Sequence, residues 1–135
     1  MNIQLIQDAN NKPNALVCSS GLAKVFWFVS GIDDLDVDDD LSDTGSSLGF
    51  NDNLTVTVEA DGLSFDVSRR FFIHLYPEDQ ARSSIFPEPD WEWNEHDTLE
   101  ADELSVFERI MDKHPELFTP PSGLVKCFIE RLGKA

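Results

Sequence analysis

The strongest pattern in the chain is an alternation of apolar and polar side chains that predicts a β-hairpin over residues 54–68. Every second residue is apolar in 54–58 and again in 63–67, and Asp61-Gly62 between these runs suits the positive φ angles of a tight turn. The second arm continues through Arg69-Arg70 until Pro77, which cannot extend a strand. The other face of this extension carries three ring-bearing side chains, Phe72, His74 and Tyr76.

Further strands are predicted near the N-terminus. Residues 3–7 and 15–18 are rich in apolar side chains and flank the Asn- and Pro-containing stretch 10–14, so we expect a first hairpin here. Residues 22–30 are apolar on both faces of an extended chain. This pattern fits a central strand, and it also fits a short buried helix, because periodicity alone does not separate the two.

Beyond residue 97 the apolar period lengthens to about 3.6 residues, which predicts two amphipathic helices. The first spans about 98–114, because Asp97-Thr98-Leu99-Glu100 matches a capping box and His114-Pro115 ends the pattern. The second spans about 122–132 and ends before Gly133. Strands followed by helices predict an α+β domain, in which an antiparallel sheet of about 4–6 strands from residues 2–76 is packed on one face by the two C-terminal helices.

Charge narrows the classes of partner. The chain has 135 residues, with 26 Asp and Glu against 10 Lys and Arg, and a net charge of −16. That length suits one acidic domain over residues 1–135. Like charge repels nucleic acid and anionic membranes, so we expect no direct nucleic-acid binding and no membrane binding. A basic protein is the partner that this charge favours.

We expect a cytoplasmic location. The N-terminal residues lack the basic start and apolar run of a secretory signal, and the longest apolar run, 25–29, is far shorter than the ~18 residues that cross a bilayer. Cys18 and Cys127 match no metal or redox spacing. We therefore predict that both are reduced thiols.

Most of the negative charge lies in two segments. The first acidic segment, residues 33–43, fails as an EF-hand loop, because a register that starts at Asp34 places Asp39 where Gly is needed and Gly45 where Glu is needed. Three sources of neutralising charge stay open, namely a basic patch on another protein, solvent ions, or calcium. Its candidate partner-binding residues are Asp33, Asp34, Asp36, Asp38, Asp39, Asp40 and Asp43.

The second acidic segment, residues 88–97, combines acids with two indole rings. Trp91 and Trp93 would share a face in an extended chain, and large aromatic side chains ringed by charge are typical of interface hot spots. Alternatively, the two rings clamp this loop onto the sheet, and both interpretations hold if only one ring is buried. The candidate partner-binding residues are Glu88, Asp90, Trp91, Glu92, Trp93, Glu95 and Asp97.

The motifs of common enzymes are missing, so we predict no catalytic residue, no cofactor and no metal site. The chain lacks a Gly-rich phosphate loop, a Gly-x-Ser-x-Gly motif and a His-Glu-x-x-His motif. His96 has Glu92 and Glu100 four residues to either side, but no second His is near and Pro89 opposes a helix there. Arg69-Arg70 could anchor an anion, although pairing with the neighbouring acids is the simpler interpretation.

These features lead to two main hypotheses. The first is a non-enzymatic inhibitor that blocks the basic cleft of a partner, namely a toxin domain or another enzyme that acts on nucleic acid. Size, acidity and tryptophan anchors resemble the general profile of immunity proteins that neutralise bacterial nuclease or deaminase toxins, and no motif matches a particular family. The second hypothesis is a DNA mimic of the anti-restriction or anti-CRISPR kind. A small metal-binding domain or an enzyme of unknown activity is the third.

Overall fold

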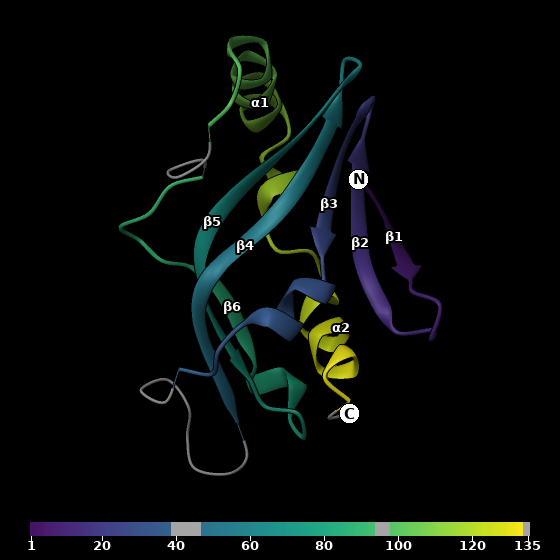
Figure 1. Cartoon of the computed structure of the whole chain (residues 1–135), viewed down its shortest axis with the longest axis vertical. Helices are drawn as coiled ribbons and strands as arrows, with labels where there is room; N and C mark the ends of the chain where they lie inside the picture. Colours follow the sequence, from purple (N-terminus) through teal and green to yellow (C-terminus); the bar gives the residue numbers. More distant parts are fainter. Residues whose placement is uncertain (39–46, 94–97, 134–135) are drawn as a thin grey trace.

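The computed structural model describes residues 1–38, 47–93 and 98–133. Its centre is a six-stranded antiparallel sheet whose strands lie side by side in chain order (Figure 1). The strands are β1 (Asn2–Gln7), β2 (Pro13–Ser20), β3 (Ala23–Phe28), β4 (Leu48–Ala60), β5 (Leu63–Leu75) and β6 (Ser84–Pro87). The helices are α1 (Ala101–Lys113), α2 (Leu124–Arg131) and the 3-10 turns η1 (Ser30–Asp34), η2 (Gln80–Arg82) and η3 (Pro115–Phe118). The predicted α+β architecture, with the sheet packed against C-terminal helices, is confirmed.

The structure decides between strand and helix for residues 22–30, because Ala23–Phe28 form β3 between β2 and β4. Val25 and Trp27 are buried in the core, whereas Phe26 and Phe28 are half-buried on the opposite face. Lys24 on that opposite face is exposed, so one face of β3 packs in the core and the other is only partly covered.

The β4–β5 hairpin is longer than the alternation predicted. It pairs without interruption from Leu48↔Leu75 to Ala60↔Leu63, and its turn residues have positive φ, 53° at Asp61 and 77° at Gly62. The sequence pattern started the first arm at residue 54, because the polar run 51–53 hides the continuation of the strand. The predicted sheet range of 2–76 was also too short, since β6 adds a sixth strand beyond it.

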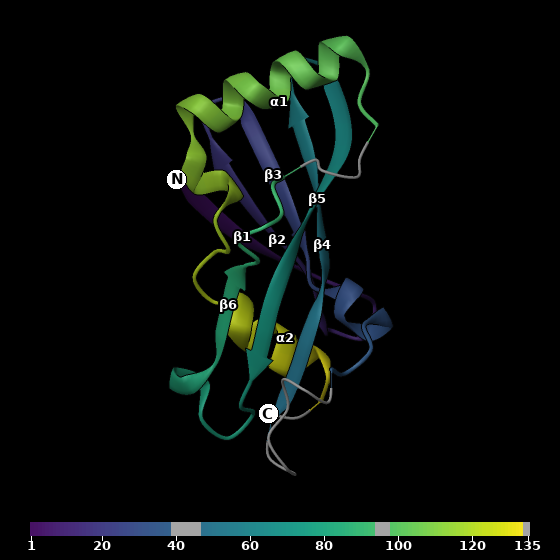
Figure 2. The ribbon, with the colours of Figure 1, turned by 90° about the vertical axis from the view of Figure 1, so that its left-hand side faces the viewer.

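Both predicted helices are present, with shorter bounds. The capping box lies one turn later than predicted, because Glu100 is the N-cap and its backbone N–H donates to Glu103 Oε1 at 3.0 Å. The same acid spacing recurs three residues along the chain, and the sequence did not distinguish the two registers. In Figure 2, α1 lies across the upper end of the strands and α2 lies behind the lower part of β5.

The helices and the sheet enclose one core with an aromatic cluster at its centre. Its rings make edge-to-face contacts, with centroid separations from 5.4 to 6.1 Å. They belong to Trp27, Phe71, Trp93, Phe107 and Phe118. Cys18 and Cys127 are buried free thiols, which confirms the prediction of reduced cysteines, and burial raises the pKa of Cys18 to about 11.

Candidate interaction surface

The described part of the first acidic segment, residues 33–38, is tied to the fold at two points. Asp33 accepts hydrogen bonds from Arg131 Nε and Nη2 at 3.0 and 2.8 Å. The backbone N–H of Asp38 donates to the C=O of Gly49 at 2.6 Å, so the chain runs beside the start of β4. Between these points, exposed carboxylates belong to Asp34 and Asp36. The predicted site residues Asp39, Asp40 and Asp43 lie outside the described residues.

Arg131 connects α2 to η1, through Asp33, and to the β1–β2 turn. Its Nη1 also lies 2.5 Å from Asp8 Oδ2 in the β1–β2 turn and 3.4 Å from the C=O of Pro13. The hydrogen bonds to Asp33, which have the largest effect, and the bond to Asp8 raise the pKa of the Arg131 guanidinium. Asp33 is therefore engaged in an internal ion pair, which makes it a weaker candidate for a partner contact than its exposed neighbours.

Glu88, the first residue of the second acidic segment, is also engaged within the fold. Its backbone N–H donates to the C=O of Arg70 at 3.0 Å, and its carboxylate oxygen Oε2 lies 2.9 Å from Arg70 Nε. Arg70 directs that N–H to Asn51 Oδ1 at 3.0 Å, so Glu88 Oε2 is attracted by the guanidinium charge and accepts no hydrogen bond among the described residues. The predicted pairing of the Arg69-Arg70 pair with neighbouring acids thus holds for Arg70.

The two tryptophans of this segment have different environments. Trp93 is 8% exposed and packs edge-to-face on Trp27, Phe71 and Phe118, so it is a core residue and not the accessible anchor that the sequence suggested. Trp91 is half-buried, and its C=O accepts a hydrogen bond from Arg69 Nε at 3.0 Å. Residues 91–93 form no strand, so the alternation expected of an extended chain does not apply. Glu95 and Asp97 lie outside the described residues.

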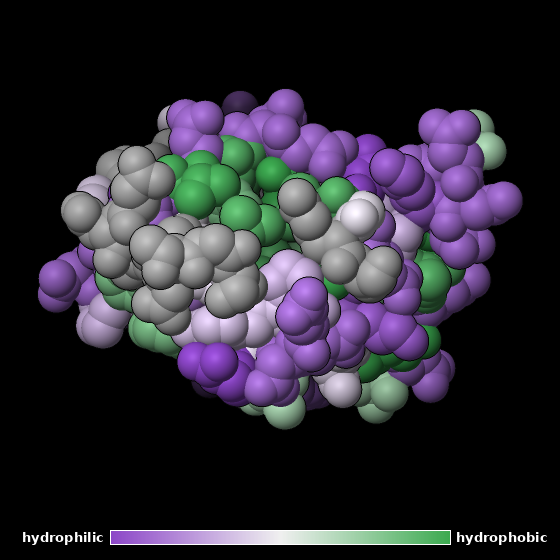
Figure 3. All heavy atoms as spheres, turned by 90° about the horizontal axis from the view of Figure 1, so that it is seen from below, coloured by the Kyte–Doolittle hydropathy of each residue, from purple (hydrophilic) through white to green (hydrophobic). Residues whose placement is uncertain are grey.

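The two acidic segments lie on opposite sides of the β4–β5 ribbon. Residue 38 is bonded to Gly49 on β4, whereas residue 88 is bonded to Arg70 on β5, and β4 and β5 are neighbours (Figure 2). Among the described residues, therefore, the fold does not bring the two segments together into one patch. Between them lies a face of the ribbon that the sequence analysis did not select. The lower end of the molecule shows apolar surface that is bordered by hydrophilic side chains (Figure 3).

This intervening face carries a group of exposed and half-buried rings, which we call the outer aromatic face. On β5, Phe71, Ile73 and Leu75 point into the core, so alternate side chains point away from it. Phe72 lies against Phe86 of β6 at a centroid separation of 5.3 Å, and Phe86 is 49% exposed. The outer aromatic face comprises four rings and the guanidinium of Arg82, which lies over one of them. The rings belong to Phe72, His74, Tyr76 and Phe86.

Contacts within the outer aromatic face hold the rings in place. The His74 ring stacks on Tyr76 at 4.7 Å, and the Arg82 guanidinium lies 4.1 Å from the centre of the Tyr76 ring. His74 Nε2 is 3.2 Å from the hydroxyl of Ser47, a buried residue before β4. A depression of about 240 Å³ is lined by Phe72, Ile73, His74, Ser84 and Phe86.

The sequence contained a signal for this surface. Phe72, His74 and Tyr76 recur at every second position opposite an equally regular apolar row, so the strand has rings on the face that the core does not use. Phe86 carried no such signal, because β6 is only four residues long and shows no alternation of its own. Its position became evident only from the register, which pairs it with Phe72.

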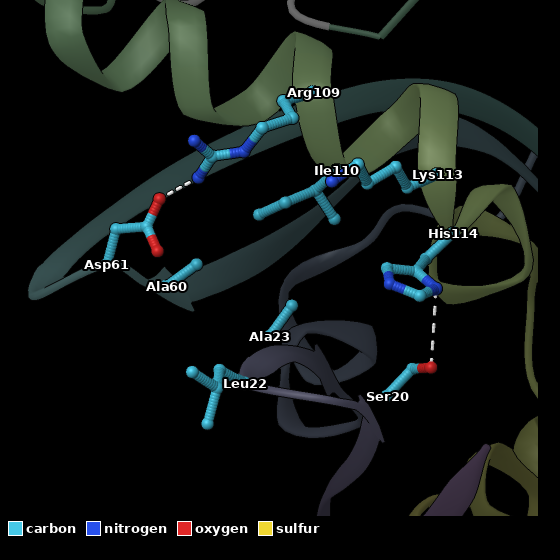
Figure 4. A pocket seen from close by; sticks show the side chains of 9 residues that line it. All are labelled: Ser20, Leu22, Ala23, Ala60, Asp61, Arg109, Ile110, Lys113 and His114. Carbon is cyan, nitrogen blue, oxygen red and sulfur yellow. Dashed lines mark hydrogen bonds and ion pairs between the residues drawn. The ribbon is translucent and has the colours of Figure 1, made fainter.

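A second hollow, of about 110 Å³, lies between α1 and the turns of the sheet (Figure 4). Arg109, Lys113 and His114 give it a basic edge, over apolar side chains that include Ile110. Two of these groups have internal partners, because Arg109 forms an ion pair with Asp61 and His114 Nδ1 lies 3.3 Å from the hydroxyl of Ser20. This hollow therefore offers little unpaired charge to a ligand.

Within residues 1–38, 47–93 and 98–133, no group of three or more His, Cys, Asp or Glu side chains is placed to hold a metal ion. His96, which the sequence analysis considered as a metal ligand and did not select, lies outside these ranges. None of the helices described there has the length and apolar character needed to cross a membrane.

Comparison with protein-family models, with curated proteins and with solved structures finds no match to this chain. The function has to be inferred from the surface itself.

Proposed function

We propose that this chain is a non-enzymatic binding protein that inhibits a basic partner protein, and that it contacts this partner through the outer aromatic face and the exposed carboxylates beside it. In this proposal the partner is a nuclease or deaminase toxin domain, or another enzyme that acts on nucleic acid, and the chain covers its basic cleft. The observation that carries the proposal is the exposure of paired rings on the open side of the sheet.

A few residues carry most of the binding energy at a protein interface, and aromatic side chains are enriched there. Truncation of such an anchor costs about 2 kcal/mol or more when the interface surrounds it. Phe86 is 49% exposed and rests against Phe72, and the stacked His74 and Tyr76 rings continue the surface along β5. The rings are already held in position, so little side-chain entropy is lost when a partner covers them.

Carboxylates lie on each side of these rings. Glu78 and Asp79 follow Tyr76 along the chain and are exposed, as is Asp90 beyond β6. On the other side, Asp36 lies two residues before Asp38, whose backbone N–H donates to the C=O of Gly49. Gly49 is paired with His74 across the β4–β5 ladder. Together with the net charge of −16, this arrangement favours fast, steered association with a cationic surface.

DNA mimicry is the weaker alternative. A mimic needs carboxylates spaced along one surface at the density of phosphates, about one per 1.7 Å of duplex. The exposed acids of the described residues are instead distributed over loops, the β4–β5 hairpin, where Glu59 and Asp66 lie on the strands, and α1, where Glu108 and Asp112 alternate with Arg109 and Lys113. The outer aromatic face has no counterpart in this alternative.

The test first asks whether a neighbouring reading frame encodes a basic nuclease or deaminase domain, and that purified domain then serves as the probe. We expect inhibition of its activity at a one-to-one ratio. Phe86→Ala should weaken binding about 30-fold or more, mainly through faster dissociation. Reversal of Asp34 and Asp36 to Lys should slow association and reduce its dependence on salt.

Two matched controls keep this test specific. Leu22→Ala removes an apolar side chain that is 92% exposed at the β2–β3 turn, away from the proposed surface. Reversal of Glu108 and Asp112 on α1 changes the net charge by the same amount as reversal of Asp34 and Asp36. Equal effects of test and control variants would reject the outer aromatic face. Displacement of the chain by duplex DNA, with no effect of Phe86→Ala, would favour the DNA mimic.

A further inference from the structure

Among the residues that the structure describes, none pairs with the outer edge of β1. β1 and β6 are the two outer strands of the sheet, and all six residues of β1 are exposed. An outer strand presents unpaired backbone N–H and C=O groups, which form a template for another strand. Three apolar side chains accompany this edge, since Ile3, Leu5 and Ile6 are 42%, 43% and 37% exposed.

The two edges of the sheet differ in how well they are protected. β6 has four residues and ends at Pro87, and short length and proline are both features that prevent edge-to-edge pairing. β1 has six residues with no proline and no charged side chain, and its pairing with β2 is regular from Asn2 to Ile6. Of the two edges, only that of β1 is suited to accept a further strand.

The distribution of net charge along the chain favours a second copy of this chain as the strand that is added to β1. Residues 1–30 carry a net charge of +1 and residues 109–135 carry +2, whereas the rest of the chain carries −19. The strand next to β1 is β2, and the helix packed on β2 is α2, so both neighbours of the edge belong to these nearly neutral parts. Two molecules with a charge of −16 each can therefore approach with least repulsion along β1.

We propose that a second copy of this chain pairs with β1 in antiparallel orientation, about a two-fold axis perpendicular to the sheet. This axis keeps the faces of the two sheets aligned, so odd-numbered residues of one copy lie opposite odd-numbered residues of the other. With Gln4 on the axis, Ile3 lies opposite Leu5 of the second copy, and each apolar side chain covers the other. About six backbone hydrogen bonds join the strands.

The dimer is a continuous sheet of two copies joined at their N-terminal edges. Ile3 pairs with Cys18 and Leu5 with Leu16, so both point to the core side of the sheet, where they extend the apolar surface of each copy. The β6 edge lies at the other side of each sheet, which leaves the outer aromatic face free in both copies. The contact is small, so we expect a dissociation constant in the micromolar range.

Sedimentation equilibrium over a range of protein concentrations tests the dimer. We expect a monomer–dimer equilibrium that becomes tighter at higher salt, because salt screens the repulsion between two acidic molecules. Leu5→Lys should weaken dimerisation at least about tenfold, since the two-fold axis introduces the charge twice. The matched control is Leu22→Lys, which makes the same change at a leucine that is 92% exposed elsewhere and should leave the equilibrium unchanged.

Amide hydrogen exchange on the unmodified chain gives a second measurement that does not depend on how a variant folds. Protection of the outward N–H groups in residues 2–7 should rise with protein concentration. A monomer at all concentrations up to the millimolar range would overturn the proposal. A dimer that Leu5→Lys and Leu22→Lys affect equally, or one without added protection in β1, would overturn it as well. This inference is independent of the proposed function.

Discussion

The indole Nε1 of Trp27 donates a buried hydrogen bond to the C=O of Leu117 at 3.0 Å, and it thereby connects the central strand β3 to η3, 90 residues later in the chain. Both residues are at most 1% exposed. Around this bond the Trp27 ring contacts Phe71 and Trp93, so one side chain contacts the sheet, the connection to α1 and the connection to α2.

Trp27→Phe should lower the free energy of unfolding by about 1–3 kcal/mol, because the Leu117 carbonyl would be left buried without its donor. Urea denaturation followed by circular dichroism measures this loss. Trp91→Phe makes the same change at a half-buried site and should cost less. Equal losses for both variants would contradict the importance of the Trp27 hydrogen bond.

The turn of the β4–β5 hairpin should require the positive φ angle of Gly62. Gly62 has φ +77°, and a Cβ there would meet no atom within 4 Å, so Gly62→Ala tests backbone strain alone. We expect it to cost about 1 kcal/mol. Gly31 has equally open surroundings without a positive φ, and Gly31→Ala should change stability by less than about 0.5 kcal/mol. A neutral Gly62→Ala variant would contradict the left-handed turn.

Stability should fall in acid partly through Asp8. The backbone N–H groups of Lys12 and Asn10, followed by Arg131, hold the pKa of Asp8 below its ordinary value of 3.8. Because the folded-state pKa is the lower one, the stabilisation is complete above pH 3.8 and is lost as pH falls through the folded-state pKa. Asp8→Asn keeps an oxygen that accepts the two backbone bonds but cannot titrate. Its melting temperature should therefore fall less steeply below pH 4 than that of the unmodified chain, and equal slopes would contradict this role.

The two cysteines should be unreactive in the folded protein. Burial raises the pKa of Cys18 to about 11 and also raises that of Cys127, so little thiolate is present near neutral pH. At pH 8 we expect a thiol-specific disulfide reagent to modify Cys18 about 100-fold more slowly in the native state than in urea, from thiolate content alone. Cys127→Ala isolates this reaction. Native rates equal to those in urea would show that Cys18 is accessible.

The sequence predicted most of the local structure. Alternation and Asp61-Gly62 placed the main hairpin, and the 3.6-residue period placed both helices, because these signals depend on neighbouring residues. The register of the capping box was wrong by one turn, because acids recur at 97, 100 and 103. The partner-binding residues stay a prediction, although Trp93 is a core residue and Asp33 is paired with Arg131.

The amino-acid sequence alone determined the α+β class, the main hairpin, the succession of strands followed by two helices and the acidity of two segments. Each depends on composition or on spacing within a short window. Tertiary structure decided which indole is buried, which aspartate has an internal cation and which rings remain exposed on β5 and β6. These outcomes depend on contacts between distant residues, such as the 98 positions between Asp33 and Arg131. Such contacts form only when strands and helices pack together, so the local pattern indicated the rings of β5 but none of these pairings.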